Sequence, residues 1–453
     1  MTDETPAFVH DLLSLPKFGS GICFRRMEVL LRPLMQSDWG QQFNTIRVTG
    51  SNGKGSVTAM LHSILQSLGI TAGRYTSPHL ERFNERIVIG SQEASDNEIE
   101  HAVQWIRQQI AENQSDLSRE TFGSFELITA IAIRCFSEAS VKTAILEAGI
   151  GGRFDPVRLF PGTLVALTSI DLEHTELLGK TKEQIAFDKI DLCPDHGTVV
   201  SVNRDQELWA RMAAYCRLRH ISLVDANSVW TVQRLDEELR VAVPGMKVRL
   251  TRNAMSADVT IPLLGLFQLD NAAVACTIAE LWAQQFLAET SPELVFRAVC
   301  DGLSAVTWPG RFQNISSAPP VYIDVGHSPD ACRRFVESVG IFLKGAPILL
   351  VTGVSHNKAV EDILSILVPI ATCVVCTRAY HMGERVERIS EVVQTIAPQI
   401  EQHTAATIEE AALLAREIAD RRGMTVIVAG GLFLSIEFLT AWRGSDPRRL
   451  RFY

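Results

Sequence analysis

The residues best suited to chemistry follow a short apolar run near the start of the chain. Residues 46–56 read IRVTGSNGKGS, and a helical pattern of apolar residues begins at Val57. A strand, a glycine-rich turn, a lysine and a hydroxyl that opens a helix are the parts of a phosphate cradle, because backbone N–H groups and a helix N-terminus attract anions. We predict that Lys54 reaches the outer phosphates of a nucleotide and that Ser56 faces its magnesium ion. The predicted nucleotide-binding residues of this turn are Asn52, Gly53, Lys54, Gly55 and Ser56.

The spacing of this turn differs from the standard phosphate-binding pattern. That pattern has glycine where Val48 stands, and it has no residue such as Gly55 between the lysine and the hydroxyl. An ordinary glycine-rich turn between a strand and a helix is the alternative. The Gly-Lys-Gly-Ser sequence at the start of an amphipathic helix favours nucleotide binding.

Further polar residues stand where other predicted strands end. Glu147 closes the apolar run TAILE, and His174 follows the run LVALTS. Ligands of open α/β sheets lie beyond the carboxyl ends of the strands, so these two side chains are candidates to hold magnesium. The alternatives are a helix cap or solvated strand end for Glu147 and a hydrogen-bonded structural histidine for His174. Lys189, near the end of a predicted helix, has the position of a solvated residue that complements the helix dipole.

A second group of candidates lies in the last third of the chain. Asp324 ends the run VYIDV and precedes His327 and Pro329 in a polar turn. An acid and a histidine there suit a nucleotide ribose or a small amino-acid substrate. A helix N-cap with Pro329 at the first helical position is the plainer interpretation, and both can hold together. Arg311, in the sequence WPGR, is either a phosphate contact or a surface arginine.

The order of predicted elements indicates an α/β protein. Strands alternate with helices from Thr45 to Val202, which predicts a largely parallel sheet. Together with the glycine-rich turn at residues 50–56, this pattern is interpreted as a P-loop-type ATPase domain. Short strands between Ile221 and Leu264, in WTVQRL, LRVAV, VRL and DVTIP, predict a small antiparallel insertion. A second α/β pattern follows several prolines and indicates a smaller, Rossmann-like C-terminal domain. The predicted divisions are residues 1–306, a linker at 307–320, and residues 321–453.

Composition narrows the class of protein. The chain has 453 residues, of which 46% are hydrophobic, and a net charge of −9, which is typical of a globular protein and argues against nucleic-acid binding. Nine cysteines without a spacing pattern fit a reducing compartment. Cys373 and Cys376 lie three apart in a predicted strand and so point to opposite faces, which disfavours a metal clip between them. The sequence has neither a signal peptide nor a membrane-spanning apolar run, so we expect a cytoplasmic protein.

Seven segments resemble, in content and order, the motifs of folylpolyglutamate synthases and dihydrofolate synthases of the Mur-ligase superfamily. The segments are VTGSNGKGS, TSPHLERFNERIVI, LEAGIGGRFD, SIDLEHTELLGKTKEQIAFDK, LLGLFQLDNAAVA, WPGRF and IDVGHSPDA. They are spread over nearly the whole chain. The resemblance implies a monomeric ligase that uses ATP to join a folate-like carboxylic acid to an amino acid such as glutamate, through an acyl phosphate and without nucleic-acid or membrane partners.

The resemblance also implies roles for single residues and a pair of magnesium ions. Ser77 and Glu147 match one metal site, and His174 matches a second. Lys189 matches a lysine that the family carbamylates, which turns an ammonium into an anionic oxygen ligand. The implied catalytic residues are Lys54, His174 and Lys189. Nucleotide contacts are implied for Asn271, Arg311, Asp324 and His327, and contacts to the acid for Phe122, Phe125, Arg153 and Asp155.

Several motifs depart from the family pattern, mostly on the side of the acid and the amino acid. Residues 156–158 are Pro-Val-Arg where the family has Ala-Thr-Asn, and residues 190–191 are Ile-Asp where it has Ala-Gly. Ser328 replaces an asparagine, and residues 357–359 read Asn-Lys-Ala where the family has Asp-Lys-Asp. Two alternatives therefore stay open. One is a ligase for a specialised non-folate acid, and the other is a catalytically silent relative that binds nucleotide or pterin.

Overall fold

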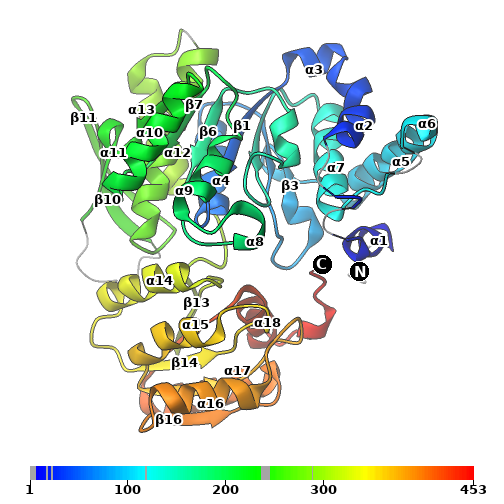
Figure 1. Ribbon diagram of the computed structural model, residues 1–453. Helices are drawn as coiled ribbons and strands as arrows, with labels where there is room; N and C mark the ends of the chain where they lie inside the picture. The colour runs from blue at the N-terminus through cyan, green and yellow to red at the C-terminus, as the bar shows by residue number, and fades with distance from the viewer. Residues whose placement is uncertain are drawn as a thin grey trace.

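The computed structural model describes residues 7–16, 19–21, 24–117, 120–235, 245–287 and 289–452. Two α/β domains are stacked with a cleft between them, and the chain crosses from the first to the second once, after α13 (Pro292–Ala305) (Figure 1). The fold therefore agrees with the predicted class: a parallel-sheet domain, a small antiparallel insertion and a separate C-terminal α/β domain.

The first domain contains an eight-stranded sheet in the order β4-β3-β2-β5-β1-β6-β7-β8. All neighbours pair in parallel except β2–β3 and β3–β4. The strands are β1 (Asn44–Thr49), β2 (Ala72–Tyr75), β3 (Ile87–Ile89), β4 (Gln92–Glu93), β5 (Thr143–Glu147), β6 (Leu164–Leu167), β7 (Thr198–Ser201) and β8 (Ser222–Asp225). Val48 pairs with Glu147, and Thr49 pairs with Leu167, so the carboxyl ends of three central strands meet at one edge.

Two apolar cores cover the two faces of this sheet. The helices on one face are α4 (Lys54–Ser67), α12 (Phe267–Phe286) and α13. The helices on the other face include α1 (Ala7–Ser14), α2 (Arg25–Met35), α5 (Asp96–Glu112), α7 (Ser124–Glu138), α9 (Lys182–Ile190) and α10 (Gln206–Leu218). Since α4 starts directly after β1 and is buried along most of its length, its N-terminus is fixed at the edge where the strands end.

The antiparallel insertion is a three-stranded sheet of β9 (Thr231–Arg234), β10 (Met246–Arg252) and β11 (Met255–Ile261). It starts later than predicted, because β8 continues the main sheet in parallel with β7. Of the expected strands, LRVAV at residues 239–243 lies outside the described residues.

The second domain contains a six-stranded sheet in the order β12-β13-β17-β14-β15-β16, in which only β12 is antiparallel to its neighbour. The strands are β12 (Gln313–Ser317), β13 (Pro320–Ile323), β14 (Ile348–Thr352), β15 (Cys373–Cys376), β16 (Glu401–Thr404) and β17 (Thr425–Ala429). The helices are α14 (Pro329–Phe342), α15 (Val360–Leu367), α16 (Val386–Ile396), α17 (Ile408–Arg422) and α18 (Leu432–Trp442). Residues 306–312 connect α13 to β12, which belongs to this sheet, and the division at 307–320 stays a prediction.

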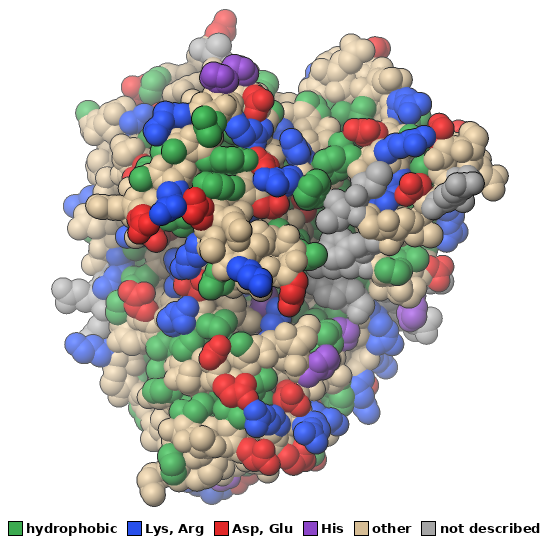
Figure 2. Space-filling model, in the orientation of Figure 1, with side chains coloured by type: hydrophobic (Ala, Val, Ile, Leu, Met, Phe, Trp, Pro, Cys, Tyr) green, Lys and Arg blue, Asp and Glu red, His purple; other side chains and the backbone are tan. Residues whose placement is uncertain are grey.

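Over the described part of the chain, no helix is long and apolar enough to cross a membrane. Figure 2 shows acidic and basic side chains interspersed over the face in view, without one extended basic patch.

Candidate active site

The carboxyl ends of strands from both domains enclose one cleft with a volume of about 440 Å³. The cleft brings together the phosphate-binding turn, the predicted metal ligands and the polar turn of the second domain. The predicted site residues that line it are Asn52, Gly53, Lys54, Gly55, Ser56, Ser77, Glu147, His174, Asn271, Arg311, Asp324 and His327.

The glycines of the phosphate-binding turn allow close approach of other parts of the site. Gly53 has a φ of +92°, and a Cβ there would lie 2.5 Å from the amide oxygen of Asn271. A Cβ on Gly55 would lie 2.4 Å from the Trp308 ring, which explains a second glycine where the standard pattern has none. The unusual spacing is therefore a packing requirement at the helix N-terminus, and the residues of the turn line the cleft.

Side-chain hydrogen bonds connect Asn271 to Ser56 through Gln268. Asn271 donates to the amide oxygen of Gln268 over 2.8 Å, and Gln268 donates to the Ser56 hydroxyl over 3.3 Å. Gln268 is fully buried, so this contact fixes the orientation of the hydroxyl that would face a cation. No role for Gln268 was predicted, because its partner Ser56 is more than two hundred residues away in the chain.

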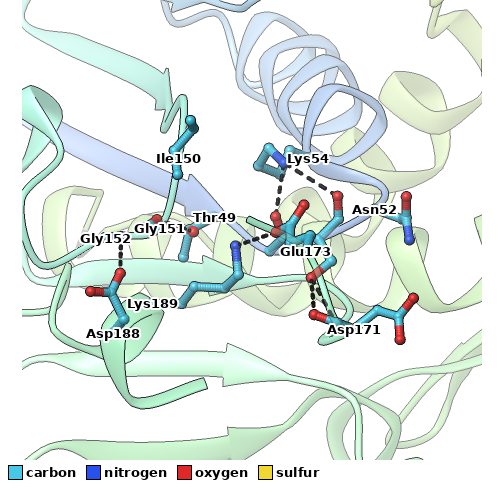
Figure 3. A network of polar contacts seen from close by, with 12 residues as sticks. Thr49, Asn52, Lys54, Ile150, Gly151, Gly152, Asp171, Glu173, Asp188 and Lys189 are labelled. Atoms are coloured by element: carbon cyan, nitrogen blue, oxygen red, sulfur yellow. Dashed lines mark hydrogen bonds and ion pairs between the residues drawn. The ribbon is translucent and has the colours of Figure 1, made fainter. Parts of the chain in front are cut away.

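Lys54 lies folded over its own loop. Its ammonium group donates to the carbonyl oxygens of Gly50, over 2.8 Å, and Ser51, over 3.4 Å (Figure 3). Carbonyl oxygens are weaker partners for an ammonium group than phosphate oxygens are. The lysine is therefore held in place and remains available to a nucleotide.

Glu147 is a buried carboxylate with an unsatisfied oxygen. Only 4% of the residue is exposed, and its Oε2 has no hydrogen-bond partner among the described residues. Burial raises the pKa of Glu147 to about 7, although Lys54 and Arg311 favour its charged form. An orphaned carboxylate oxygen beside a phosphate cradle fits a hard divalent cation such as Mg²⁺.

Lys189 is buried and forms an ion pair, so its interpretation as a solvated helix residue is wrong. Only 1% of it is exposed, and Nζ lies 2.7 Å from Oε1 of Glu173 (Figure 3). Burial lowers the pKa of Lys189, while Glu173 opposes that shift. Burial alone would raise the pKa of Glu173, but Lys54 and Lys189 outweigh it and lower that pKa to about 2. Glu173 lines the cleft beside His174, whereas Lys189 supports it from behind.

None of the four residues expected to contact the acid lines the cleft. These residues are Phe122, Phe125, Arg153 and Asp155. Phe122 is buried, and a Cβ on Gly149 would lie 2.7 Å from the Phe125 ring. Asp155 accepts hydrogen bonds from the backbone N–H groups of Gly149, Ile150 and Val157. Arg153 donates to Asp191 over 2.6 Å. Both oxygens of Asp155 thus accept hydrogen bonds from the protein itself, whereas Arg153 is exposed and pairs with Asp191 through its Nε.

The turn that contains Asp324 and His327 was interpreted both as a ligand contact and as a helix N-cap. Asp324 accepts from the backbone N–H of Phe312 over 3.0 Å and of Gly326 over 2.8 Å, so it fixes the segment that carries Arg311. Ser328 caps α14, and Pro329 is its first residue, which confirms the N-cap. His327 lies between these two features with an exposed side chain on the cleft.

The phosphate-binding turn also contacts the second domain directly. The amide of Asn52 donates to Oδ2 of Asp330 over 3.2 Å, and Arg334 donates to the same oxygen over 3.0 Å. This hydrogen bond joins the loop that would hold the nucleotide to the start of α14.

Comparisons with known proteins agree with this geometry. Residues 48–279 match the Mur ligase middle domain, and residues 310–432 match the glutamate ligase domain of Mur ligases. The folylpolyglutamate synthase of Lacticaseibacillus casei is 32% identical over 361 residues, which cover 78% of this chain and 80% of that protein. The chain belongs to the folylpolyglutamate synthase family of Mur ligases.

Other family members extend the comparison. A folylpolyglutamate synthase from Mycobacterium tuberculosis, complexed with ADP and AMPPCP, has a TM-score of 0.83 at 25% identity, covering 97% of this chain and 98% of that one. The match to the probable bifunctional folylpolyglutamate synthase/dihydropteroate synthase of Haloferax volcanii is 30% identical and covers 88% of this chain and 46% of the relative. The chain thus spans about half the length of that relative, and about half of the Halobacterium salinarum protein of the same name.

Two cleft residues of this folylpolyglutamate synthase family member, Lys358 and Arg204, had no predicted role. Lys358 lies in the altered Asn-Lys-Ala segment, lines the cleft and is attracted electrostatically by Glu173 across it. Arg204 forms an ion pair with Asp270 at the cleft, with Nε 3.0 Å from Oδ2. The departure from Asp-Lys-Asp could have directed attention to Lys358, whereas no local signal marks Arg204.

Asp191, one of the departures from the family pattern, does not point at the Lys189 amine. It accepts hydrogen bonds from Arg153, Tyr215 and Arg219 over 2.6, 2.7 and 2.6 Å. The carboxylate is buried and joins the end of α9 to the turn after Glu147 and to α10.

Replacing Asp191 by asparagine is expected to destabilise the protein by about 2–3 kcal/mol, because it removes the buried carboxylate that pairs with Arg153 and with Arg219, whose side chain is only 19% exposed. Urea unfolding measures the change. Asp195→Asn is the matched control, since the Asp195 side chain is 63% exposed and pairs with Arg219 at the rim, and it should cost less than about 1 kcal/mol. Equal losses in the two variants would show that Asp191 is not the centre of this cluster.

Proposed function

We propose that this protein is an ATP-dependent amide ligase that joins the carboxylate of a folate-type acid to an amino acid such as glutamate through an acyl phosphate. The observation that carries the proposal is the position of Glu147, whose orphaned oxygen lies next to the phosphate-binding turn on the neighbouring strand. The names of relatives support the substrate class: folylpolyglutamate synthase in L. casei and dihydrofolate synthase/folylpolyglutamate synthase in Bacillus subtilis.

The reaction has two steps that these residues can serve. A carboxylate oxygen attacks the γ-phosphorus of ATP, the bond to ADP breaks, and Lys54 with the N-terminus of α4 neutralises charge on the transferring group. The amine of the amino acid then attacks the acyl carbon, phosphate leaves, and the amine loses a proton. Arg311, in the connection between the domains, and Lys358, in the second domain, line this space and can attract the phosphates or the amino-acid carboxylate.

The cleft offers oxygen and nitrogen ligands for two cations. Ser56, Ser77 and Glu147 would hold one Mg²⁺, and His174 with Glu173 or Lys189 would serve a second. Bound Mg²⁺ would supply Lewis-acid stabilisation of charge on the phosphate oxygens. Carbamylation of Lys189 requires its neutral amine, which burial favours and the ion pair with Glu173 opposes. Intact-mass measurement after incubation with bicarbonate tests that modification.

ADP release in the presence of acid and amino-acid pairs tests the function. We expect release that requires both co-substrates and magnesium. The altered residues 156–158 and Asp191 favour a second candidate, a ligase for a non-folate acid. Turnover with another acid but not with dihydropteroate would support it. ATP binding without ADP release for any pair would favour the silent relative.

The cysteines bear on the location of the protein. All eight described cysteines are free thiols, which fits a reducing compartment, and we place the enzyme in the cytoplasm as a monomer. Its partners in this proposal are small molecules: ATP, the carboxylic acid and the amino acid.

A further inference from the structure

Three metal-ligating side chains of three kinds gather at the outer edge of the second domain, far from the cleft. Cys373 of β15 pairs directly with Glu401 of β16, and His403 stands two residues further along β16 on the same face. The Cys373 sulfur, a Glu401 oxygen and a His403 ring nitrogen all lie within 4.8 Å of one another. Figure 1 places β16 at the end of the domain opposite the cleft. We propose that these residues form a binding site for a transition-metal ion of the zinc class.

The chemistry of the three ligands selects this class of ion. Thiolate and imidazole prefer zinc and similar ions, whereas magnesium and calcium prefer oxygen ligands alone. Thiolate and carboxylate together neutralise a divalent ion, and a water molecule can complete four-coordinate geometry. The Cys373 sulfur lies beneath the surface, while the side chains of Glu401 and His403 are 43% and 36% exposed, so an ion can enter from solvent.

The second cysteine of the C-x-x-C sequence takes no part in this site. Cys373 belongs to the apolar core under α17, whereas Cys376 belongs to the core on the other face and contacts the Gln402 side chain. The strand geometry thus confirms that the two cysteines do not form a clip. The additional ligands come from the neighbouring strand, and Cys376 becomes a natural control.

Arg422, at the end of α17, competes with the ion. Its Nη1 and Nη2 atoms each lie 2.7 Å from an oxygen of Glu401, and His403 lies 3.1 Å from the same carboxylate. This ion pair holds Glu401 in place when no metal is bound. Metal binding replaces the ion pair by a bond to the ion and releases the thiol proton of Cys373. The Arg422 side chain is 44% exposed, so water can solvate it after release at little cost.

Titration of the full chain, freed of metal with a chelator, with Zn²⁺ and with Co²⁺ tests the site. We expect Co²⁺ to produce a thiolate charge-transfer band in the near ultraviolet. Among the described residues that line the cleft there is no cysteine, so these residues do not account for such a band. Cys373→Ser should abolish the band. Cys373→Ser and His403→Ala should each weaken Zn²⁺ binding by at least about 10-fold. Cys376→Ser should change neither.

A fourth variant separates a metal site from a simple ion pair. Arg422→Ala removes the competitor and should tighten Zn²⁺ binding, although it loses the contact to Glu401. Weaker or unchanged Zn²⁺ binding in this variant would overturn the proposal. Absence of the cobalt band in the unmodified chain, or its persistence in Cys373→Ser, would do the same. ADP release should stay unchanged in Cys373→Ser, because the site lies at the far end of the second domain.

Discussion

Replacing Lys54 by alanine is expected to lower ATP turnover by about a thousandfold while leaving the fold intact. Among the described residues, the hydrogen bonds of the ammonium group go to two carbonyl oxygens of its own loop, so its removal should cost little stability. It is the cation best placed to meet the outer phosphates, where loss of one charge-stabilising group typically costs that much in rate. Steady-state ADP release measures the effect, and thermal unfolding measures the fold.

Lys344→Ala is the matched control, because Lys344 is an exposed lysine of the second domain outside the cleft. It should keep normal turnover. If Lys54→Ala retained more than about a tenth of the normal rate, the phosphate-cradle interpretation of this turn would be wrong. A variant that loses both turnover and its cooperative unfolding transition would instead point to a structural role for Lys54.

Replacing Glu147 by glutamine is expected to stabilise the metal-free protein and to remove magnesium-dependent turnover. Burial raises the pKa of Glu147 from its ordinary value of 4.5 to about 7, so the folded state holds this proton more tightly than the unfolded state. Between those two pH values the folded protein binds more protons, and stability falls as pH rises. At pH 8 the buried charge destabilises the protein fully, and glutamine removes that effect.

Thermal unfolding with a chelator at pH 5 and pH 8 checks the sign. The variant should melt a few degrees above the unmodified protein at pH 8 and close to it at pH 5. Added Mg²⁺ should raise the melting temperature of the unmodified protein only, since binding to the folded state stabilises it. A variant that is less stable at pH 8, or that still responds to Mg²⁺, would contradict the assignment of Glu147.

Glu437→Gln provides the control for this experiment. Burial also raises the pKa of Glu437 to about 7, but its two oxygens accept hydrogen bonds from the backbone N–H groups of Tyr380 and His381. An amide group has only one oxygen, so this substitution should destabilise the protein at both pH values and leave the magnesium response unchanged.

Local patterns in the sequence were sufficient to predict several helices and the strand ends that carry site residues. The sequence predicts a helix over residues 124–138 and further helices that start at Pro329, Val360 and Ile408. The helix α7 has those bounds, and α14, α15 and α17 start at those three residues, because caps, prolines and apolar spacing lie within each segment. The same patterns place Lys54, Glu147 and Asp324 at strand ends, and parallel pairing brings such ends to one edge of a sheet. The sequence analysis did not predict α18, whose two faces are both buried and which therefore has no amphipathic period.

The partners of charged side chains were decided only by the tertiary structure. Glu173 holds Lys189, Asp191 gathers two arginines, and Arg153 and Asp155 bind the protein instead of facing the cleft. The grouping of Cys373 with Glu401 likewise depends on which strand pairs with β15. Sequence spacing fixes the side of a helix or strand on which a residue stands. Which residue faces a given side chain across a sheet or between helices depends on how distant segments pack together. Burial then influences whether an ionisable side chain is charged.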